Sequence, residues 1–356
     1  MESQIVKPYK KYLIVWMDIL GFKERVKKSA SNEVEIDNIK DTLELANSLA
    51  MYFSQTTKLA TVEAGVFSDT IVITCPNPDV AAVFGAIGMT SLYQIVMAKQ
   101  RHFLRGAAVI GALYSKGKNI VFGPAIIHAM EMEKVGIWPR IVVDPRLQEE
   151  IAPLTVAKLR FVSRQADVSI SSHSIKENIE PANEYTINNL VKTFLKQGAD
   201  GILYIDYLRC AFDILMPMRW ALQLSKKASP VMKIIEMDLL PTHRDAIIAT
   251  LKSDEYKNNI EVLTKYHSLA KYHNDVIDTL SELLLTLPDT VEMTQSIDFQ
   301  FMYALFSPML KWAKIGMTEN DKRTLFHKNL KKLSERVHEF KEYKIDLPEK
   351  FPQMYR

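Results

Sequence analysis

Cysteine is scarce in this chain of 356 residues, where only Cys75 and Cys210 occur. Two cysteines supply neither a disulfide framework nor a structural zinc cluster, and this usage favours a reducing compartment. Glycine and proline are also few, with 12 and 15 residues, which excludes collagen-like and low-complexity chains. The net charge of +3 is too small to indicate binding to nucleic acid or to a membrane surface.

Long hydrophobic runs are nearly absent. The first apolar run, residues 12–17, ends at Asp18 and is too short for a signal peptide. Residues 80–98 carry no charged side chain, but glycines and polar residues lower their hydrophobicity, and no second run accompanies them. We expect a buried helix there and a soluble, cytoplasmic protein without a membrane partner. The apolar fraction of 47% and the chain length predict a globular protein of about two domains.

Residues 1–150 show the periodicity of a mixed α+β domain. Period-2 and continuous apolar runs predict strands at 11–17, 60–67, 70–75, 104–114 and 140–143. Helical spacing predicts helices at 35–53, 80–101 and 123–134. The short link at 67–69 allows only an antiparallel hairpin. The resulting β-α-β-β-α-β-α-β order predicts a ferredoxin-like (βαββαβ) antiparallel palm with extra elements.

The rest of the chain has a different character. Segment 151–241 is expected to complete or flank the first domain, with a polar loop at 169–183, a strand at 201–208 and a helix at 211–225. From 242 to 356 the pattern is helical, with one helix expected to continue to about residue 285. This extension is expected to serve dimerisation or sensing. Its last helix carries a coiled-coil-like seam formed by Phe326, Leu330, Leu333, Val337 and Phe340.

Two carboxylates are placed where chemistry can occur. Asp18 ends the first strand, and Asp69 lies in the turn between the second and third strands. In a ferredoxin-like sheet the first and third strands are adjacent, so both residues are expected at one edge. Paired carboxylates repel unless a cation lies between them, and Mg²⁺ or Mn²⁺ with substrate phosphates fits such a pair. The plainer alternative is that Asp18 caps a helix and Asp69 forms the turn.

Local motifs extend this interpretation. Residues 16–22, WMDILGF, resemble the F-x-D-I-x-G-F motif that opens class III nucleotidyl cyclase domains. Residues 67–69, FSD, match the position of the second metal-binding acid of that family. Residues 105–111, RGAAVIG, resemble its fourth strand, R-x-G-I-H-x-G. The resemblance covers roughly residues 10–145.

The resemblance implies a reaction and a site. Asp18 and Asp69 would bridge two Mg²⁺ or Mn²⁺ ions, and the carbonyl of Ile19 would add a ligand. The 3′-oxygen of a nucleoside triphosphate would attack its own α-phosphate and release pyrophosphate, a phosphorus–oxygen lyase reaction. Two chains of such a family pair head to tail, so a homodimer is expected. Backbone N–H groups at a helix start would hold the β- and γ-phosphates, namely those of Leu20, Gly21, Phe22 and Lys23.

The departures from the family pattern concern base recognition. Purine cyclases place an asparagine and an arginine where this chain has Ile127 and Glu131, and a base-reading lysine or glutamate where it has Gly65. Because the metal-binding acids are kept, a change of base is favoured over loss of activity. The pattern resembles the pyrimidine cyclases of bacterial Pycsar antiphage systems, which make cyclic UMP or cyclic CMP for a separate effector. UTP is preferred to CTP only because uridylate cyclases are the commoner type there.

Further residues are assigned by the same interpretation. Tyr52 is expected to fill the space of a purine and to contact the pyrimidine, and Gly65 to lie at the base. Arg105 is expected to supply positive charge at the α-phosphate, and Lys116 and Lys118 to reach the triphosphate. The alternatives are a core aromatic for Tyr52, a structural pair with Asp18 for Arg105, and solvated turn lysines.

Other chemistry finds little support. The eight histidines show no metal-ligand spacing and are expected to be structural, and Arg140 is a weaker candidate for phosphate contact. No phosphate-binding P-loop, dinucleotide fingerprint, nucleophile elbow or H-E-x-x-H motif occurs. Three alternatives to a pyrimidine cyclase stay open: a purine cyclase, a nucleotide-binding module without turnover, and an oligonucleotide synthase.

Overall fold

The computed structural model divides the chain into two compact units, residues 1–207 and 208–356. The unit boundary falls within the segment 151–241. The structure describes residues 8–56, 62–78, 80–116, 120–151, 194–224, 238–253, 259–287, 302–303, 310 and 315–348. The expected polar loop at 169–183 lies outside these residues.

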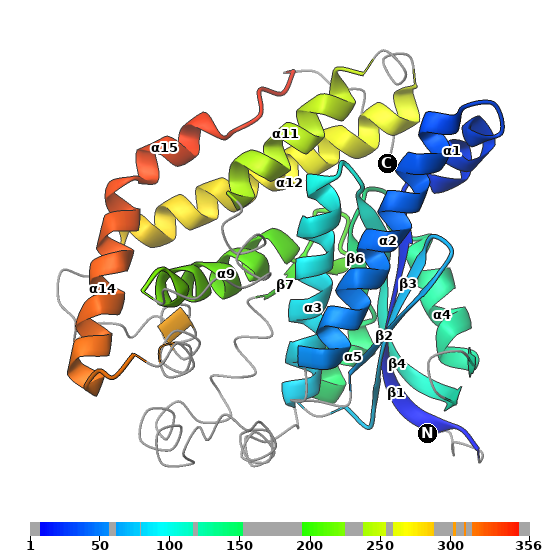
Figure 1. Ribbon diagram of the computed structural model, residues 1–356, viewed down its shortest axis with the longest axis horizontal. Coiled ribbons are helices and arrows are strands. Elements are labelled where there is room, and N and C mark those ends of the chain that lie inside the picture. The colour runs from blue at the N-terminus through cyan, green and yellow to red at the C-terminus, as the bar shows by residue number, and fades with distance from the viewer. Residues whose placement is uncertain are drawn as a thin grey trace. The chain divides into compact units, whose positions relative to one another are not determined.

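The first unit is built on an eight-stranded mixed sheet (Figure 1). The strand order is β2-β3-β1-β4-β6-β8-β7, with β5 paired to β4 alone. β4 and β6 are parallel, and the other pairs are antiparallel. The strands are β1 (Lys10–Ile19), β2 (Glu63–Phe67), β3 (Thr70–Pro76), β4 (Leu104–Lys116), β5 (Ile120–Phe122), β6 (Ile141–Val143), β7 (Leu195–Gln197) and β8 (Leu203–Ile205).

The expected adjacency of the first and third strands is confirmed. β1 lies between β3 and β4, with Asp18 opposite Thr70 on one side and opposite Arg105 on the other. β1 is central because residues 12–15 are buried in succession, as expected for a strand covered on both faces. The position of β1 brings the C-terminal end of this strand next to the β2–β3 turn, at the edge of the sheet that is formed by strand ends.

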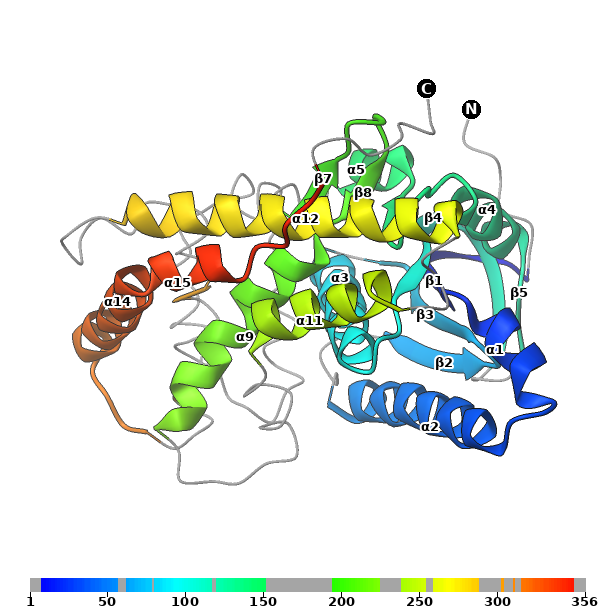
Figure 2. The same cartoon turned by 90° about the horizontal axis from the view of Figure 1, so that it is seen from above.

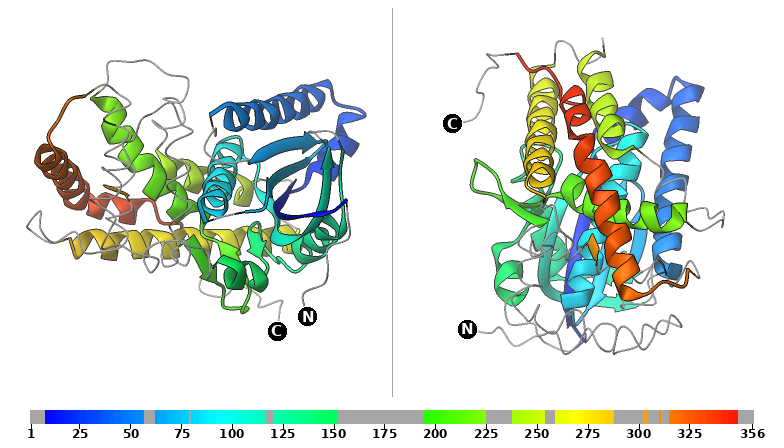
Figure 3. Two further views of the ribbon diagram at one scale, coloured as in Figure 1. Left: turned by 90° about the horizontal axis from the view of Figure 1, so that it is seen from below. Right: turned by 90° about the vertical axis from the view of Figure 1, so that its left-hand side faces the viewer.

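Helices cover the two faces of this sheet (Figures 2 and 3). Helices α2 and α3 lie on one face, and α4 lies on the other, where Ala125 and Ala129 pack with Ile14 and Val109. The expected helices at 35–53, 80–101 and 123–134 are confirmed. The helices of this unit are α1 (Phe22–Ser29), α2 (Glu33–Thr56), α3 (Val80–Lys99), α4 (Pro124–Glu133) and α5 (Pro145–Ile151).

The uncharged segment is a core helix. Among the described residues, the window 82–99 of α3 is long and apolar enough to cross a membrane, but 78% of it is buried within the protein. Its hydroxyl groups are satisfied within the helix, as Thr90 donates to the carbonyl of Ala86 and Ser91 donates to that of Ile87. This burial is the pattern of a helix in a protein core, as expected from the sequence.

The second unit is helical in its described part. Its helices are α9 (Tyr207–Gln223), whose first residue still belongs to the first unit, α11 (Leu239–Leu251), α12 (Ile260–Leu285), α14 (Glu319–Glu335) and α15 (Val337–Glu342). The single helix expected up to residue 285 is wrong, because α11 ends before a separate helix begins with Asn259 as its N-cap. An N-cap side chain that accepts a bond from the first turn starts a new helix.

The single helix expected to carry the coiled-coil-like seam near the C-terminus is also wrong. α14 ends at Glu335 and α15 begins at Val337, so the seam is split between two helices. Phe326 and Leu330 are almost fully buried within one chain. The ring of Phe326 lies 5.8 Å from that of Trp220 on α9. These apolar side chains therefore form part of the core of this unit.

Candidate active site

Strand pairing places the two predicted acids together. Asp18 lies at the end of β1, and the N–H of the next residue, Ile19, donates to the carbonyl of Asp69 over 3.2 Å. Ser68 has a positive φ of 56°, a conformation typical of a tight hairpin turn. The turn thus holds Asp69 beside the end of β1. The prediction that Asp18 and Asp69 converge at one sheet edge is confirmed.

The carboxylates of Asp18 and Asp69 lie within hydrogen-bonding reach of each other. The pKa of Asp18 is raised to about 6, first by burial and then by the charge and hydrogen bond of Asp69, while Arg105 lowers it. Two carboxylates can share a hydrogen bond only when one of them holds a proton. The pair therefore retains a proton below about pH 6 and gains a second negative charge above it.

Arg105 is engaged by two carboxylates. Its Nη2 lies 3.2 Å from Oδ2 of Asp18, and its Nε lies 2.9 Å from Oε1 of Glu133. The structural pair with Asp18, left open by the sequence, is what the structure shows, so contact of Arg105 with a phosphate stays a prediction. Sequence reasoning missed Glu133. The available signal was an acidic residue at the C-terminal end of a helix, where the dipole disfavours negative charge.

The segment after β1 begins a helix at the same edge. Gly21 has φ 77° and precedes the first residue of α1, Phe22, so a side chain there would be strained. The N–H of Leu20 donates to the carbonyl of Phe103 over 2.9 Å. Leu20 is therefore engaged within the fold, which leaves Gly21, Phe22 and Lys23 as the expected phosphate donors.

A partly buried polar cluster links α1 and α2 to the residue that precedes Phe103 at the start of β4. Arg25 forms an ion pair with Glu35 at 2.6 Å, and its Nη1 lies 3.0 Å from Nδ1 of His102. Thr42 donates to the carbonyl of Asn38, so its hydroxyl oxygen accepts from Nε2 of His102, 2.8 Å away. Burial lowers the pKa of His102 to about 4, with the charge of Arg25 acting in the same direction. His102 is thus neutral and structural, as expected.

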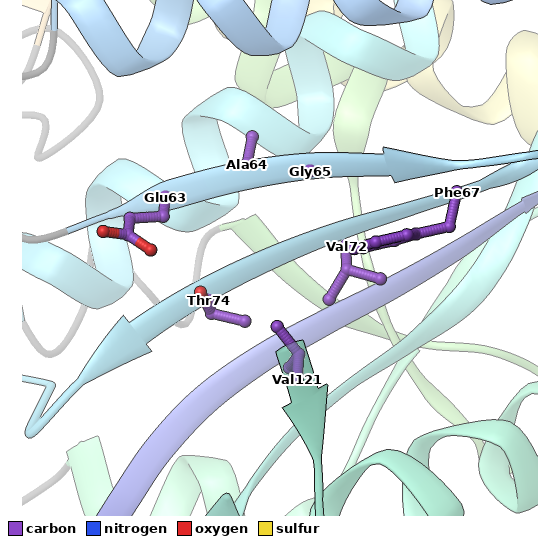
Figure 4. Close-up of a pocket in the computed structure, with 7 residues that line it drawn as sticks. All are labelled: Glu63, Ala64, Gly65, Phe67, Val72, Thr74 and Val121. Atoms are coloured by element: carbon purple, nitrogen blue, oxygen red, sulfur yellow. The ribbon is translucent and has the colours of Figure 1, made fainter. Parts of the chain in front are cut away.

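A shallow groove runs along β2 and β3 on the face that carries Asp18. Thr70 lies opposite Asp18, and alternation places Val72 and Thr74 on the same face. The groove is open to solvent. Gly65 leaves its middle without a side chain (Figure 4). The lining residues are Glu63, Ala64, Gly65, Phe67, Val72, Thr74 and Val121.

Other predicted residues lie apart from this edge or beyond the described residues. Tyr52 belongs to α2, the helix on the opposite face from α4. Lys116 ends β4, and Lys118 lies outside the described residues.

Arg140 does not lie free for phosphate contact. Its side chain is fully buried, forms an ion pair with Asp200, and lies over the rings of Trp138 and Tyr204 at 5.0 and 5.3 Å. Phosphate contact by Arg140 is therefore ruled out by its partners.

The donor set suits a hard divalent cation. Two carboxylate groups that approach within hydrogen-bonding distance provide the oxygen ligands that Mg²⁺ and Mn²⁺ prefer. Within the described residues, no group of three or more His, Cys, Asp or Glu side chains could hold a metal ion. A site here would therefore use Asp18, Asp69 and backbone oxygen such as that of Ile19, completed by substrate phosphates.

No protein-family model matches this chain, and neither does any curated protein sequence.

Proposed function

We propose that this protein is a pyrimidine nucleotide cyclase of class III type. It converts UTP, or CTP, to the 3′,5′-cyclic nucleotide and pyrophosphate. The observation that carries the proposal is the Asp18–Asp69 pair at the edge of the sheet, buried enough to raise the pKa of Asp18 to about 6. Further support comes from the strand order β2-β3-β1-β4 with helices between β1 and β2 and between β3 and β4, which is the order of a βαββαβ palm.

Each group of the site has a separate role in this proposal. Asp18, Asp69 and the carbonyl of Ile19 would hold two Mg²⁺ or Mn²⁺ ions, which polarise the phosphates and lower the pKa of the attacking hydroxyl. The backbone N–H groups at the start of α1, from Gly21 to Lys23, bind the β- and γ-phosphates. The ribose 3′-oxygen gives its proton to solvent water and forms a bond to the α-phosphorus. The bond between that phosphorus and the oxygen bridging to the β-phosphate breaks, and pyrophosphate leaves with this oxygen. Because nucleophile and electrophile belong to one molecule, the protein supplies mainly orientation and positive charge.

The groove supports a base other than a purine. Gly65 stands in its middle, where the purine cyclases that the motifs resemble carry a base-reading side chain. The ring of Phe67, 42% exposed, offers a surface on which a base can stack. The hydroxyl of Thr74 can supply a donor, and the carboxylate of Glu63 an acceptor, for its polar edge. In the proposal the cytoplasmic homodimer makes cyclic UMP or cyclic CMP as the messenger for a separate antiphage effector.

A nucleotide panel tests the proposal. The purified protein is incubated with Mn²⁺ and each of UTP, CTP, ATP and GTP, and the products are identified by mass spectrometry. Cyclic UMP or cyclic CMP as the main product is expected. Asp69→Asn should lower the rate at least 100-fold because it removes a metal-ligand charge. Asp37→Asn, an exposed carboxylate of α2, should leave the rate unchanged.

Other products would contradict the proposal in distinct ways. Cyclic AMP or cyclic GMP as the main product identifies a purine cyclase. Linked nucleotides identify an oligonucleotide synthase. Nucleotide binding without pyrophosphate release, insensitive to Asp69→Asn, identifies a module that senses nucleotides without turnover.

A further inference from the structure

The groove along β2 and β3 has a carboxylate and a hydroxyl at one end. Glu63 on β2 and Thr74 on β3 are paired directly across the two strands, so their side chains lie on one face. Figure 4 shows both of them at the end of the groove away from Phe67. Within the described part of the chain, neither the carboxylate nor the hydroxyl has a hydrogen bond or an ion pair. Thr74 is only 5% exposed, and a buried hydroxyl without a partner has a free-energy cost that a ligand can remove.

The other end of the groove lies next to the acid pair. Phe67 ends β2 two residues before Asp69. Gly65 lies midway between Phe67 and Glu63, roughly 7 Å along the strand from each. A base over Gly65, on a nucleotide whose phosphates are at the acid pair, therefore directs its polar edge at Glu63 and Thr74.

These two groups match the polar edge of cytosine. An ionised carboxylate only accepts hydrogen bonds, whereas a hydroxyl can donate one. Cytosine presents its 4-amino group, which donates, beside the ring nitrogen N3, which accepts. Glu63 can accept from the amino group, the pairing that glutamate makes with cytosine in nucleic acids. Thr74 can donate to N3 at the same time.

The same two groups fit uracil poorly. Uracil has a carbonyl at position 4, which only accepts and therefore repels the carboxylate of Glu63. If the carboxylate accepts from N3–H instead, it lies between the carbonyl oxygens at positions 2 and 4. Their partial negative charges then oppose the negative charge of Glu63.

We propose that Glu63 and Thr74 select cytosine, so that CTP and not UTP is the preferred substrate. The inference rests on the proposed function, because it takes the phosphates to lie at the acid pair. The selection acts on the amino group at position 4 of the pyrimidine. Adenine also presents an amino group beside a ring nitrogen, so ATP is included in the test.

Competition between CTP and UTP measures this selection. The purified full chain is incubated with Mn²⁺ and equal concentrations of both, and the ratio of cyclic CMP to cyclic UMP gives the ratio of their kcat/KM values. We expect a ratio of about 10 to 100, the range for reading one base. Glu63→Gln, whose amide can donate to the carbonyl of uracil, should lower this ratio about tenfold. Glu44→Gln, at an exposed carboxylate of α2, should leave it unchanged.

A second variant tests the hydroxyl. Thr74→Val keeps the shape of the side chain and should lower kcat/KM for CTP about threefold to tenfold, because N3 loses its donor. The product ratio does not depend on how much of a variant is folded, so a folding defect cannot imitate the effect of Glu63→Gln.

The outcomes separate this inference from the proposed function. Cyclic UMP as the predominant product, or the parent ratio in Glu63→Gln, would overturn the selection by Glu63 and leave a pyrimidine cyclase. Cyclic AMP as the main product when ATP is added, or no cyclic product at all, would contradict the proposed function. Without turnover, calorimetry of CTP and UTP binding still tests the groove, and equal affinities would overturn the inference.

Discussion

Two neighbouring positions of β4, near the strand ends that carry Asp18, require side chains of very different size. Arg105 needs a long charged side chain to reach Asp18 on β1 and Glu133 on α4. Gly106 needs no side chain at all. A Cβ atom on Gly106 would lie 1.8 Å from the carbonyl oxygen of Trp16, a backbone atom that cannot move without displacing β1. The close approach of the two strands, which brings Arg105 to Asp18, therefore depends on glycine at this position.

We expect Gly106→Ala to destabilise the first unit severely, by about 3 kcal/mol or more, because two backbone segments must separate. Chemical unfolding monitored by circular dichroism measures this change. Gly85→Ala is the matched control. Gly85 lies in α3, has open space at its Cβ position, and should gain roughly 0.5–1 kcal/mol from better helix propensity. Equal stability of the two variants would contradict the close approach of β1 and β4.

At the scale of elements, two buried histidines connect α11, α12 and the segment after α15. Nδ1 of His243 lies 3.0 Å from Nδ1 of His273, and Nε2 of His273 lies 2.9 Å from the carbonyl oxygen of Tyr343. A carbonyl only accepts, so Nε2 of His273 carries its hydrogen. Nδ1 of a neutral His273 then accepts from His243. Next to this pair, Asn274 exchanges two hydrogen bonds of 2.9 Å with the backbone of Ile345.

This histidine pair predicts a loss of stability in acid. Burial lowers the pKa of His273 to about 4 and lowers that of His243 as well. The unfolded chain therefore binds more protons than the folded protein between about pH 6.5 and pH 4, so the unfolding free energy falls as the pH falls through that window. For His273 the effect is on the order of 3 kcal/mol.

The free energy of unfolding of the second unit is measured by urea titration at a series of pH values from 7.5 to 4. His273→Asn should lower stability at pH 7.5 and flatten the pH dependence. His338→Asn, on the exposed side of α15, should change neither. A pH dependence as steep in His273→Asn as in the parent chain would contradict the assignment.

At the scale of the whole molecule, titratable groups change stability in opposite directions. Folding lowers the pKa of His102 in the first unit and of the histidine pair in the second. The free energy of unfolding is therefore highest above the unfolded pKa of histidine and falls as the pH falls below it. Asp18 acts in the reverse sense. Its pKa rises from 3.8 to about 6 on folding, so the folded protein binds the extra proton, and this contribution is lost as the pH rises through about 6. Above pH 6 the site therefore holds repelling charge, which a cation can neutralise.

Mn²⁺ should accordingly stabilise the protein at pH 7.5 and have little effect at pH 5, where it must displace the proton on Asp18. At ten times its dissociation constant the ion should add about 1.4 kcal/mol, a rise of roughly 2–4 °C in the melting temperature. Thermal unfolding with Mn²⁺ and then with excess chelator measures this shift. Asp69→Asn should abolish it. A shift of equal size at both pH values would argue against binding at this pair.

Much of the first unit could be predicted from local pattern alone. The apolar run before Asp18, the glycine at position 21 and the short link at 67–69 are signals carried by neighbouring residues, so strands, helices and hairpin were placed close to their observed bounds. The convergence of Asp18 and Asp69 followed from the order of these elements. The short strands β5 and β7 were missed because three residues carry too little periodicity to distinguish a strand from a loop.

What the sequence by itself determined is therefore the order of elements and the edge at which the two acids meet, because hydrophobic periodicity and turn chemistry act over a few residues. Only the tertiary structure decided that Glu133 forms an ion pair with Arg105, that His243 lies beside His273, and that Phe326 packs on Trp220 within the same chain. Each of these contacts joins residues on different elements, separated by many positions along the chain. Such contacts depend on how helices and strands pack in three dimensions, and no local pattern encodes that packing.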